Sequence, residues 1–141
     1  MVLLDTNVIS ELAKAEPNPT VLAYVGGLAP DTVFTAAVCE AEIRYGLARM
    51  AHGRKRDQLI ARMALFFDRG FPDQVLRFDR ACTAAYGEIR HAREVVGIPI
   101  AMGDAMIAAT ARAYGVPVIA TRNVKDFTGC GVLLVDPWVT P

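Results

Sequence analysis

Four acidic residues stand at positions where a side chain could face a binding site. Asp5 directly follows the apolar run 2–4, and Asp104 follows a glycine at the start of an alanine-rich segment. Glu42 has small and aromatic neighbours, and Asp126 stands in a polar segment near the C-terminus. Carboxylate oxygens are the ligands that Mg²⁺ and Mn²⁺ prefer. Converging acids without a cation would repel one another, so their convergence would indicate a divalent-metal site able to activate water beside a phosphate.

Two glutamates share one segment, and their neighbours separate their roles. Glu40 is followed four residues later by Arg44, a helical spacing that allows a surface ion pair. Glu42 has Tyr45 and Gly46 at the corresponding positions and therefore no cation to pair with. We expect Glu40 to be solvated and paired and Glu42 to face a pocket, with an exposed Glu42 as the alternative.

The three aspartates also have purely structural explanations. Aspartate is a preferred N-cap and interacts favourably with the helix dipole, which would account for Asp5 and for Asp104. Thr6 and Ser10 can also cap a helix that begins after Asp5, so this role does not require Asp5. Asp126 could be an ordinary turn residue.

Alternating strands and helices are expected to position these side chains. Apolar and β-branched runs predict strands at 2–4, 32–35, 75–78, 116–121 and 132–135. Apolar periodicity and helix-stop residues predict helices at 7–14, 19–25, 38–50, 54–69, 80–96 and 103–114, of which 80–96 is the longest. This order is typical of an α/β fold with a mostly parallel sheet covered on both faces. Residues 1–141 show no linker or repeat, so we expect a single domain.

In open α/β folds, ligands bind at the carboxyl edge of the sheet. This rule selects residues 5–7, after the first strand, and 121–123, after the strand at 116–121. Arg122 and Lys125 are expected beside this pocket, where a phosphate backbone would pass. The other clustered basic residues are expected mostly on solvated helix faces: Arg44, Arg49, Arg54, Lys55, Arg56, Arg90, Arg93 and Arg112.

Composition and short motifs disfavour several function classes. Fifteen Lys and Arg balance fifteen Asp and Glu, and this zero net charge argues against strong non-specific binding to nucleic acid. His52 and His91 lie among charged residues and are expected to be exposed, which disfavours a two-histidine nuclease or a zinc hydrolase. The motifs GxxxxGK(S/T), GxGxxG and GxSxG do not occur.

The cellular setting is expected to be the cytoplasm. The three cysteines are far apart and odd in number, which indicates reduced thiols. The sequence has no apolar run of about 18 residues, the length that suggests a membrane span. The N-terminus lacks the features of a signal peptide.

Four segments of the sequence, taken together, resemble those of a known family. They are 3–11 (LLDTNVISE), 41–46 (AEIRYG), 103–111 (GDAMIAATA) and 119–123 (IATRN), the last followed by Asp126 and Phe127. Each segment alone is a weak signal. In this order and across nearly the whole chain, they resemble the PIN-domain family, specifically the VapC-type toxins of bacterial toxin–antitoxin pairs in the FitB-like branch.

The resemblance implies a PIN-like three-layer α/β/α sandwich and Mg²⁺-dependent hydrolysis of RNA phosphodiester bonds, with Mn²⁺ as a substitute. Asp5, Glu42 and Asp104 match the acidic positions of the family and would hold the metal, and Asp126 would join them in catalysis. Many members carry an acid where this chain has Asn123, so either Asn123 or Asp126 completes the site for one or two ions. The resemblance also implies a homodimer and a cognate antitoxin, through which alone the protein would reach DNA.

Two other function classes remain open at this point. A haloacid-dehalogenase-like phosphatase would use Asp5 as its nucleophile, although Asn7 stands where that class has a second aspartate. A non-catalytic regulatory module would act only together with an antitoxin.

Overall fold

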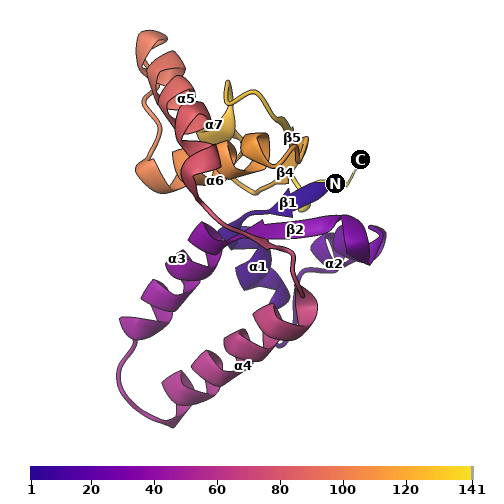
Figure 1. Cartoon of the computed structure of the whole chain (residues 1–141). Coiled ribbons are helices and arrows are strands. Elements are labelled where there is room, and N and C mark those ends of the chain that lie inside the picture. Colours follow the sequence, from indigo (N-terminus) through magenta and orange to yellow (C-terminus); the bar gives the residue numbers. More distant parts are fainter. Residues whose placement is uncertain (141) are drawn as a thin grey trace.

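The computed structural model describes residues 1–140, and at its centre is a five-stranded sheet. The strands are β1 (Val2–Leu4), β2 (Val33–Ala36), β3 (Val75–Leu76), β4 (Val118–Ala120) and β5 (Leu133–Val135). Neighbouring strands all run parallel, in the order β3-β2-β1-β4-β5 (Figure 1). The chain builds the sheet outward from β1 on one side and then from β4 on the other. The strand order therefore reverses between β1 and β4. A crevice at the carboxyl ends of two strands that flank such a reversal is a common ligand site.

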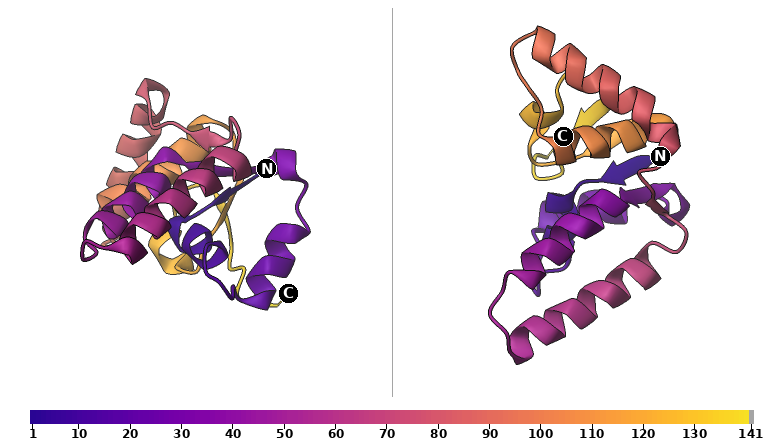
Figure 2. Two further views of the ribbon diagram at one scale, coloured as in Figure 1. Left: turned by 90° about the horizontal axis from the view of Figure 1, so that it is seen from below. Right: turned by 60° about the vertical axis from the view of Figure 1, so that its left-hand side comes forward.

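Helices cover both faces of this sheet. Their bounds are α1 (Thr6–Leu12), α2 (Pro19–Gly26), α3 (Ala37–Ala48), α4 (Arg54–Gly70), α5 (Thr83–Val95), α6 (Met102–Ala113) and α7 (Val124–Phe127), with the 3-10 helices η1 (Pro30–Thr32) and η2 (Arg80–Cys82). Helices α5, α6 and α7 lie on one side of the sheet, and α1 to α4 lie on the other (Figures 1 and 2). The predicted three-layer α/β/α sandwich is confirmed.

The central strand β1 packs into both helical layers. Leu3 belongs to an apolar cluster with Ile107 of α6, and Leu4 belongs to a second cluster with Val8 of α1. Successive side chains of a strand point to opposite faces. The continuous apolar run 2–4 is therefore what a strand buried on both faces requires. This burial fixes the point at which β1 ends and Asp5 begins.

The predicted elements are present, but two differences bear on the function. The prediction of one longest helix over 80–96 is wrong, because Asp79 accepts a hydrogen bond from the Ala81 N–H (3.1 Å) and caps η2 first. The longest helix is instead α4, with 17 residues. Residues 124–127, predicted as a loop, form the short helix α7, which carries Asp126.

Two strands are shorter than their predicted ranges by two residues or more. The strand predicted at 116–121 is reduced to β4, since Pro117 has no N–H to donate to a ladder. The edge strand β3 retains two residues of the range 75–78. Neither change moves the carboxyl ends of β1 and β4, where the acids gather.

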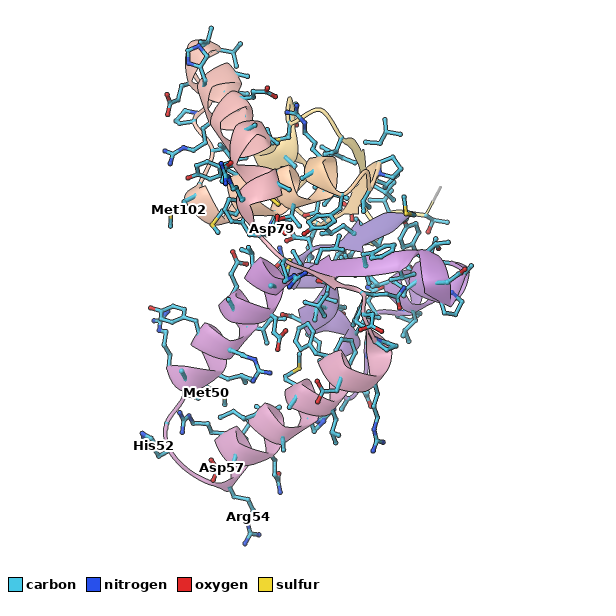
Figure 3. All side chains as sticks on the ribbon, viewed as in Figure 1. Met50, His52, Arg54, Asp57, Asp79 and Met102 are labelled. Carbon is cyan, nitrogen blue, oxygen red and sulfur yellow. The ribbon has the colours of Figure 1, made fainter. Side chains whose placement is uncertain are left out.

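Histidine and cysteine are common metal ligands, but in this fold neither residue type adds a ligand to the acidic residues. His52 lies at the tip of the hairpin formed by α3 and α4, away from the sheet (Figure 3), and His91 is exposed on α5. The three cysteines are free and buried, as expected for reduced thiols. Burial raises the pKa of the Cys39 thiol to about 12, so this thiol stays protonated near neutral pH.

Within residues 1–140, none of the helices combines the length and the apolar character that crossing a bilayer demands.

Candidate active site

Asp5 lies at the carboxyl end of β1 and is only 4% exposed. Its Oδ1 accepts a hydrogen bond from the Thr6 N–H (2.7 Å), and its Oδ2 accepts one from the Thr121 hydroxyl (2.8 Å). Thr121 follows β4, the strand paired in parallel with β1, so the two residues share one edge. Asp5 is therefore the N-cap of α1, a role that the sequence analysis had not required of it. The same two hydrogen bonds hold its carboxylate in one orientation.

Glu42 reaches the same edge from α3. The Thr6 hydroxyl, which is not used for capping, donates a hydrogen bond to Glu42 Oε2. Glu42 is exposed, as the alternative interpretation held, yet this bond ties its carboxylate to the residue after Asp5. The predicted ion pair of Glu40 with Arg44 is confirmed at 2.6 Å.

The start of α6 comes very close to Glu42. A Cβ atom added to Gly103 would lie 2.6 Å from Glu42 Oε1, nearer than real Cβ contacts allow. Only glycine leaves room for the carboxylate at this point. Asp104 follows directly in the first turn of α6 and lies within electrostatic range of Glu42.

The pKa shifts show that the acids influence one another. Burial raises the pKa of Asp5, the hydrogen bonds from Thr121 and Thr6 oppose the rise, and the Glu42 and Asp126 carboxylates add to it. Burial and, after it, the carboxylates of Asp5, Asp126 and Glu42 together raise the pKa of Asp104 to about 6. Four acids from four separate segments therefore act on one small region.

The donor set of this region fits a hard divalent cation. All four candidate groups are carboxylates, and a cation among them would reverse the repulsion that raises two of their pKa values. Among residues 1–140, no three His, Cys, Asp or Glu side chains are gathered as tightly as the ligands of one bound ion. The acids are thus close enough to interact electrostatically, but their carboxylates do not form a coordination sphere.

Comparison with known families identifies the fold. The PIN domain profile matches residues 2–128, which span β1 to α7 and include all four acids. The chain belongs to the PIN domain family.

Individual relatives of this PIN domain are similar over nearly their whole length. The toxin FitB of Neisseria gonorrhoeae is 37% identical, with 98% of this chain and 99% of that protein covered. The VapC ribonuclease Y4jK of Sinorhizobium fredii is also 37% identical, with 98% of each chain covered. In a solved structure of FitAB bound to an IR36 DNA fragment, one chain is 36% identical to this one. The alignment covers 100% of this chain and 98% of that chain, with a TM-score of 0.91. These matches favour the PIN expectations over the phosphatase hypothesis.

In the segment after β4 of this PIN domain, Asn123 and Asp126 have different surroundings. The Asn123 N–H donates a hydrogen bond to the Thr121 hydroxyl (3.0 Å), so Asn123 supports the partner of Asp5 through its main chain. The Asp126 carboxylate is among those that raise the pKa values of Asp5 and Asp104, in both cases after burial as the main cause. Asp126 is exposed on α7 but lies within electrostatic range of both acids.

The basic residues behave less uniformly than the sequence analysis expected. Arg122 is exposed and lies over the Trp138 ring, 5.1 Å from its centroid, and Lys125 is exposed on α7. Arg93, expected on a solvated helix face, is instead 5% exposed. That expectation is wrong because the guanidinium is enclosed by main-chain carbonyls of two other segments.

Sequence reasoning missed several residues that support the acids. Thr6 was noted only as a possible cap and Thr121 only as the first residue of the range 121–123. Their bonds to Glu42 and Asp5 join segments far apart in the chain. Gly103 had one visible signal, a glycine directly before an acid at a helix start. Arg93 had none, since its spacing resembles that of the exposed arginines around it.

Proposed function

We propose that this PIN domain is a divalent-metal-dependent ribonuclease and the toxin of a toxin–antitoxin pair. The observation that carries the proposal is the convergence of Asp5, Glu42, Asp104 and Asp126 on one edge of the sheet. The relatives named as a VapC ribonuclease and as the toxin FitB support the substrate class and the biological role.

In this proposal Asp5, Glu42 and Asp104 hold Mg²⁺, for which Mn²⁺ can substitute, and Asp126 completes the acidic site. The bound ion supplies a water of lowered pKa and neutralises charge on the phosphate. Thr121 and Thr6 fix the direction of the Asp5 oxygens, and Thr6 also fixes Glu42. Glu42 or Asp104 orients the attacking water, and Arg122 and Lys125 contact the RNA backbone.

The partners follow from the relatives and from the charge of the chain. FitB has been solved within a FitAB complex bound to DNA. We propose that this chain likewise forms a homodimer, binds a cognate antitoxin in the cytoplasm and reaches DNA only through it. The zero net charge supports this assignment, because the chain has no excess of cations with which to bind DNA itself.

The direct test is an assay of the purified protein on RNA, with Mg²⁺, with Mn²⁺ and after chelation by EDTA. We expect cleavage with either ion, none in excess EDTA, and inhibition when the co-expressed antitoxin is bound. Cleavage that persists in EDTA would contradict the metal mechanism. Growth arrest without any RNA cleavage would favour the regulatory module, and phosphate release from small phosphoesters with RNA left intact would favour the phosphatase.

A Gly103→Ala variant is expected to fold but to cleave RNA about tenfold to a hundredfold more slowly, because the new methyl group displaces the Glu42 carboxylate. The free energy of unfolding should not fall, since alanine is the better helix former by about 1 kcal/mol and the displaced group is the end of a flexible side chain. Gly87→Ala in α5 is the matched control, because nothing lies within 4 Å of its added Cβ. Initial cleavage rates and melting temperatures of both variants check this prediction, and equal rates would contradict it.

A further inference from the structure

Arg93 of α5 is a buried cation whose hydrogen bonds all go to main-chain carbonyls. Its Nε donates to the Ile98 carbonyl (2.6 Å), and its Nη1 donates to the carbonyls of Asp126 (2.9 Å) and Thr128 (2.7 Å). The residue is 5% exposed and takes part in none of the four ion pairs that the structure describes within residues 1–140. A buried charge is costly unless its environment compensates for it, so this arrangement needs an explanation.

Two of the three carbonyls belong to the segment that carries Asp126, and the third lies in the connection that leads to Asp104. Ile98 lies in the connection between α5 and α6, four residues before Met102 begins α6 and six before Asp104. Asp126 and Thr128 lie at the end of α7. We propose that Arg93 is a positioning residue that holds α7 against α6, so that the Asp126 carboxylate stays beside Asp104 for metal binding.

Helix α7 needs such an anchor because it cannot stabilise itself. It has four residues, and Asn123 makes no side-chain capping bond at its start. Isolated helices of this length are unstable in water. The Arg93 guanidinium donates two hydrogen bonds at the end of the helix, one to the carbonyl of Asp126 and one to that of Thr128. The backbone of the acid, rather than its carboxylate, is what Arg93 fixes.

The charge of Arg93 also suits this position. Arg93 partly opposes the burial and the carboxylates that raise the pKa of Asp104, so it lies within electrostatic range of the acids. A cation enclosed beside clustered carboxylates offsets part of their repulsion before a metal ion binds. A planar guanidinium can bond several carbonyls at once, whereas the lysine ammonium is a point charge on a flexible stem.

This inference rests on the proposed function only where it assigns Asp126 to a metal site, and its test does not depend on RNA cleavage. Mn²⁺ affinity is measured by calorimetry for the whole protein and for Arg93→Met and Arg93→Lys. We expect at least about tenfold weaker binding for both variants, as is typical when a group that orients metal ligands is lost. Arg90→Met is the matched control, since Arg90 is on the same helix and bonds the Tyr86 hydroxyl (3.0 Å).

Amide hydrogen exchange supplies a readout of the anchor itself. Residues 124–130 should exchange faster in Arg93→Met than in Arg90→Met, while the strands keep their protection. Adding Arg93→Met to Asp126→Asn should weaken Mn²⁺ binding by less than adding it to the native chain, because both changes act on one ligand.

Unchanged Mn²⁺ affinity in a folded Arg93→Met protein, or full additivity with Asp126→Asn, would overturn the inference. If Arg93→Met does not fold, the same measurements are made on Arg93→Lys, which keeps the positive charge, and the same results would overturn the inference. A native protein that binds Mn²⁺ but leaves RNA intact would overturn the proposed function and not the role of Arg93. If the native protein does not bind Mn²⁺, unchanged exchange of residues 124–130 would still overturn the anchor.

Discussion

An Asp5→Asn variant is expected to fold normally and to lose Mg²⁺-dependent RNA cleavage by about a hundredfold or more. Asparagine has the same shape and is an equally good N-cap, so the bond from the Thr6 N–H can remain. What is lost is one negative charge, held at 4% exposure against the metal site. A catalytic metal ion contributes several kcal/mol of charge stabilisation, and each 1.36 kcal/mol corresponds to a factor of about ten in rate.

Initial rates of RNA cleavage over a range of Mg²⁺ concentrations measure this loss, with circular dichroism to confirm the fold. Glu40→Gln is the control, because Glu40 forms a surface pair with Arg44 that contributes about 0.5 kcal/mol or less. Its rate should equal that of the native protein. Cleavage by Asp5→Asn that continues in excess EDTA would contradict the assignment of Asp5 as a metal ligand.

An Asp104→Asn variant is expected to be more stable than the native protein without metal and nevertheless to lose most of its activity. The pKa of Asp104 is raised to about 6 from an ordinary value of 3.8, mainly by burial and then by neighbouring carboxylates. At pH 7 the folded protein therefore carries an unfavourable charge that the unfolded chain tolerates. Asparagine removes that charge and, with it, the carboxylate that we propose as a metal ligand.

The sign of the pH dependence follows from the same shift. As the pH falls from 7 through about 6, the folded native protein binds a proton at Asp104 before the unfolded chain does. Its free energy of unfolding without metal should therefore rise toward pH 5 and fall again as the pH increases. The rise should be smaller in Asp104→Asn, with a remainder from Asp5, whose pKa is also raised.

Melting temperatures between pH 5 and 7 in EDTA test this expectation. Added Mg²⁺ should raise the melting temperature of the native protein at pH 7, because an ion that binds only the folded state stabilises it, and should raise that of Asp104→Asn less. A lower melting temperature for Asp104→Asn at pH 7 in EDTA would contradict the prediction. So would an equal response of both proteins to Mg²⁺.

The sequence by itself determined the architecture and the places of two acids. The apolar run 2–4 can be buried on both faces only in a central parallel strand, and such a strand presents the residue after it, Asp5, at the carboxyl edge. The glycine before Asp104, at the start of an alanine-rich segment, predicted the position of the second acid, Asp104. The ion pair of Glu40 with Arg44 was equally legible, because it depends on helical spacing alone.

Only the tertiary structure decided how the site is completed. The proposed role of Asp126 depends on the hydrogen bonds from Arg93 to the end of α7, which join residues more than 30 positions apart in the chain. The capping of α1 by Asp5, which leaves the Thr6 hydroxyl to Glu42, depends on where α3 lies, as does the approach of Gly103. The pattern of apolar residues in a segment predicts which face of a helix or strand is buried. It does not predict which distant main-chain groups a buried side chain will contact. The side chains that orient the acids therefore became visible only once the segments were packed together.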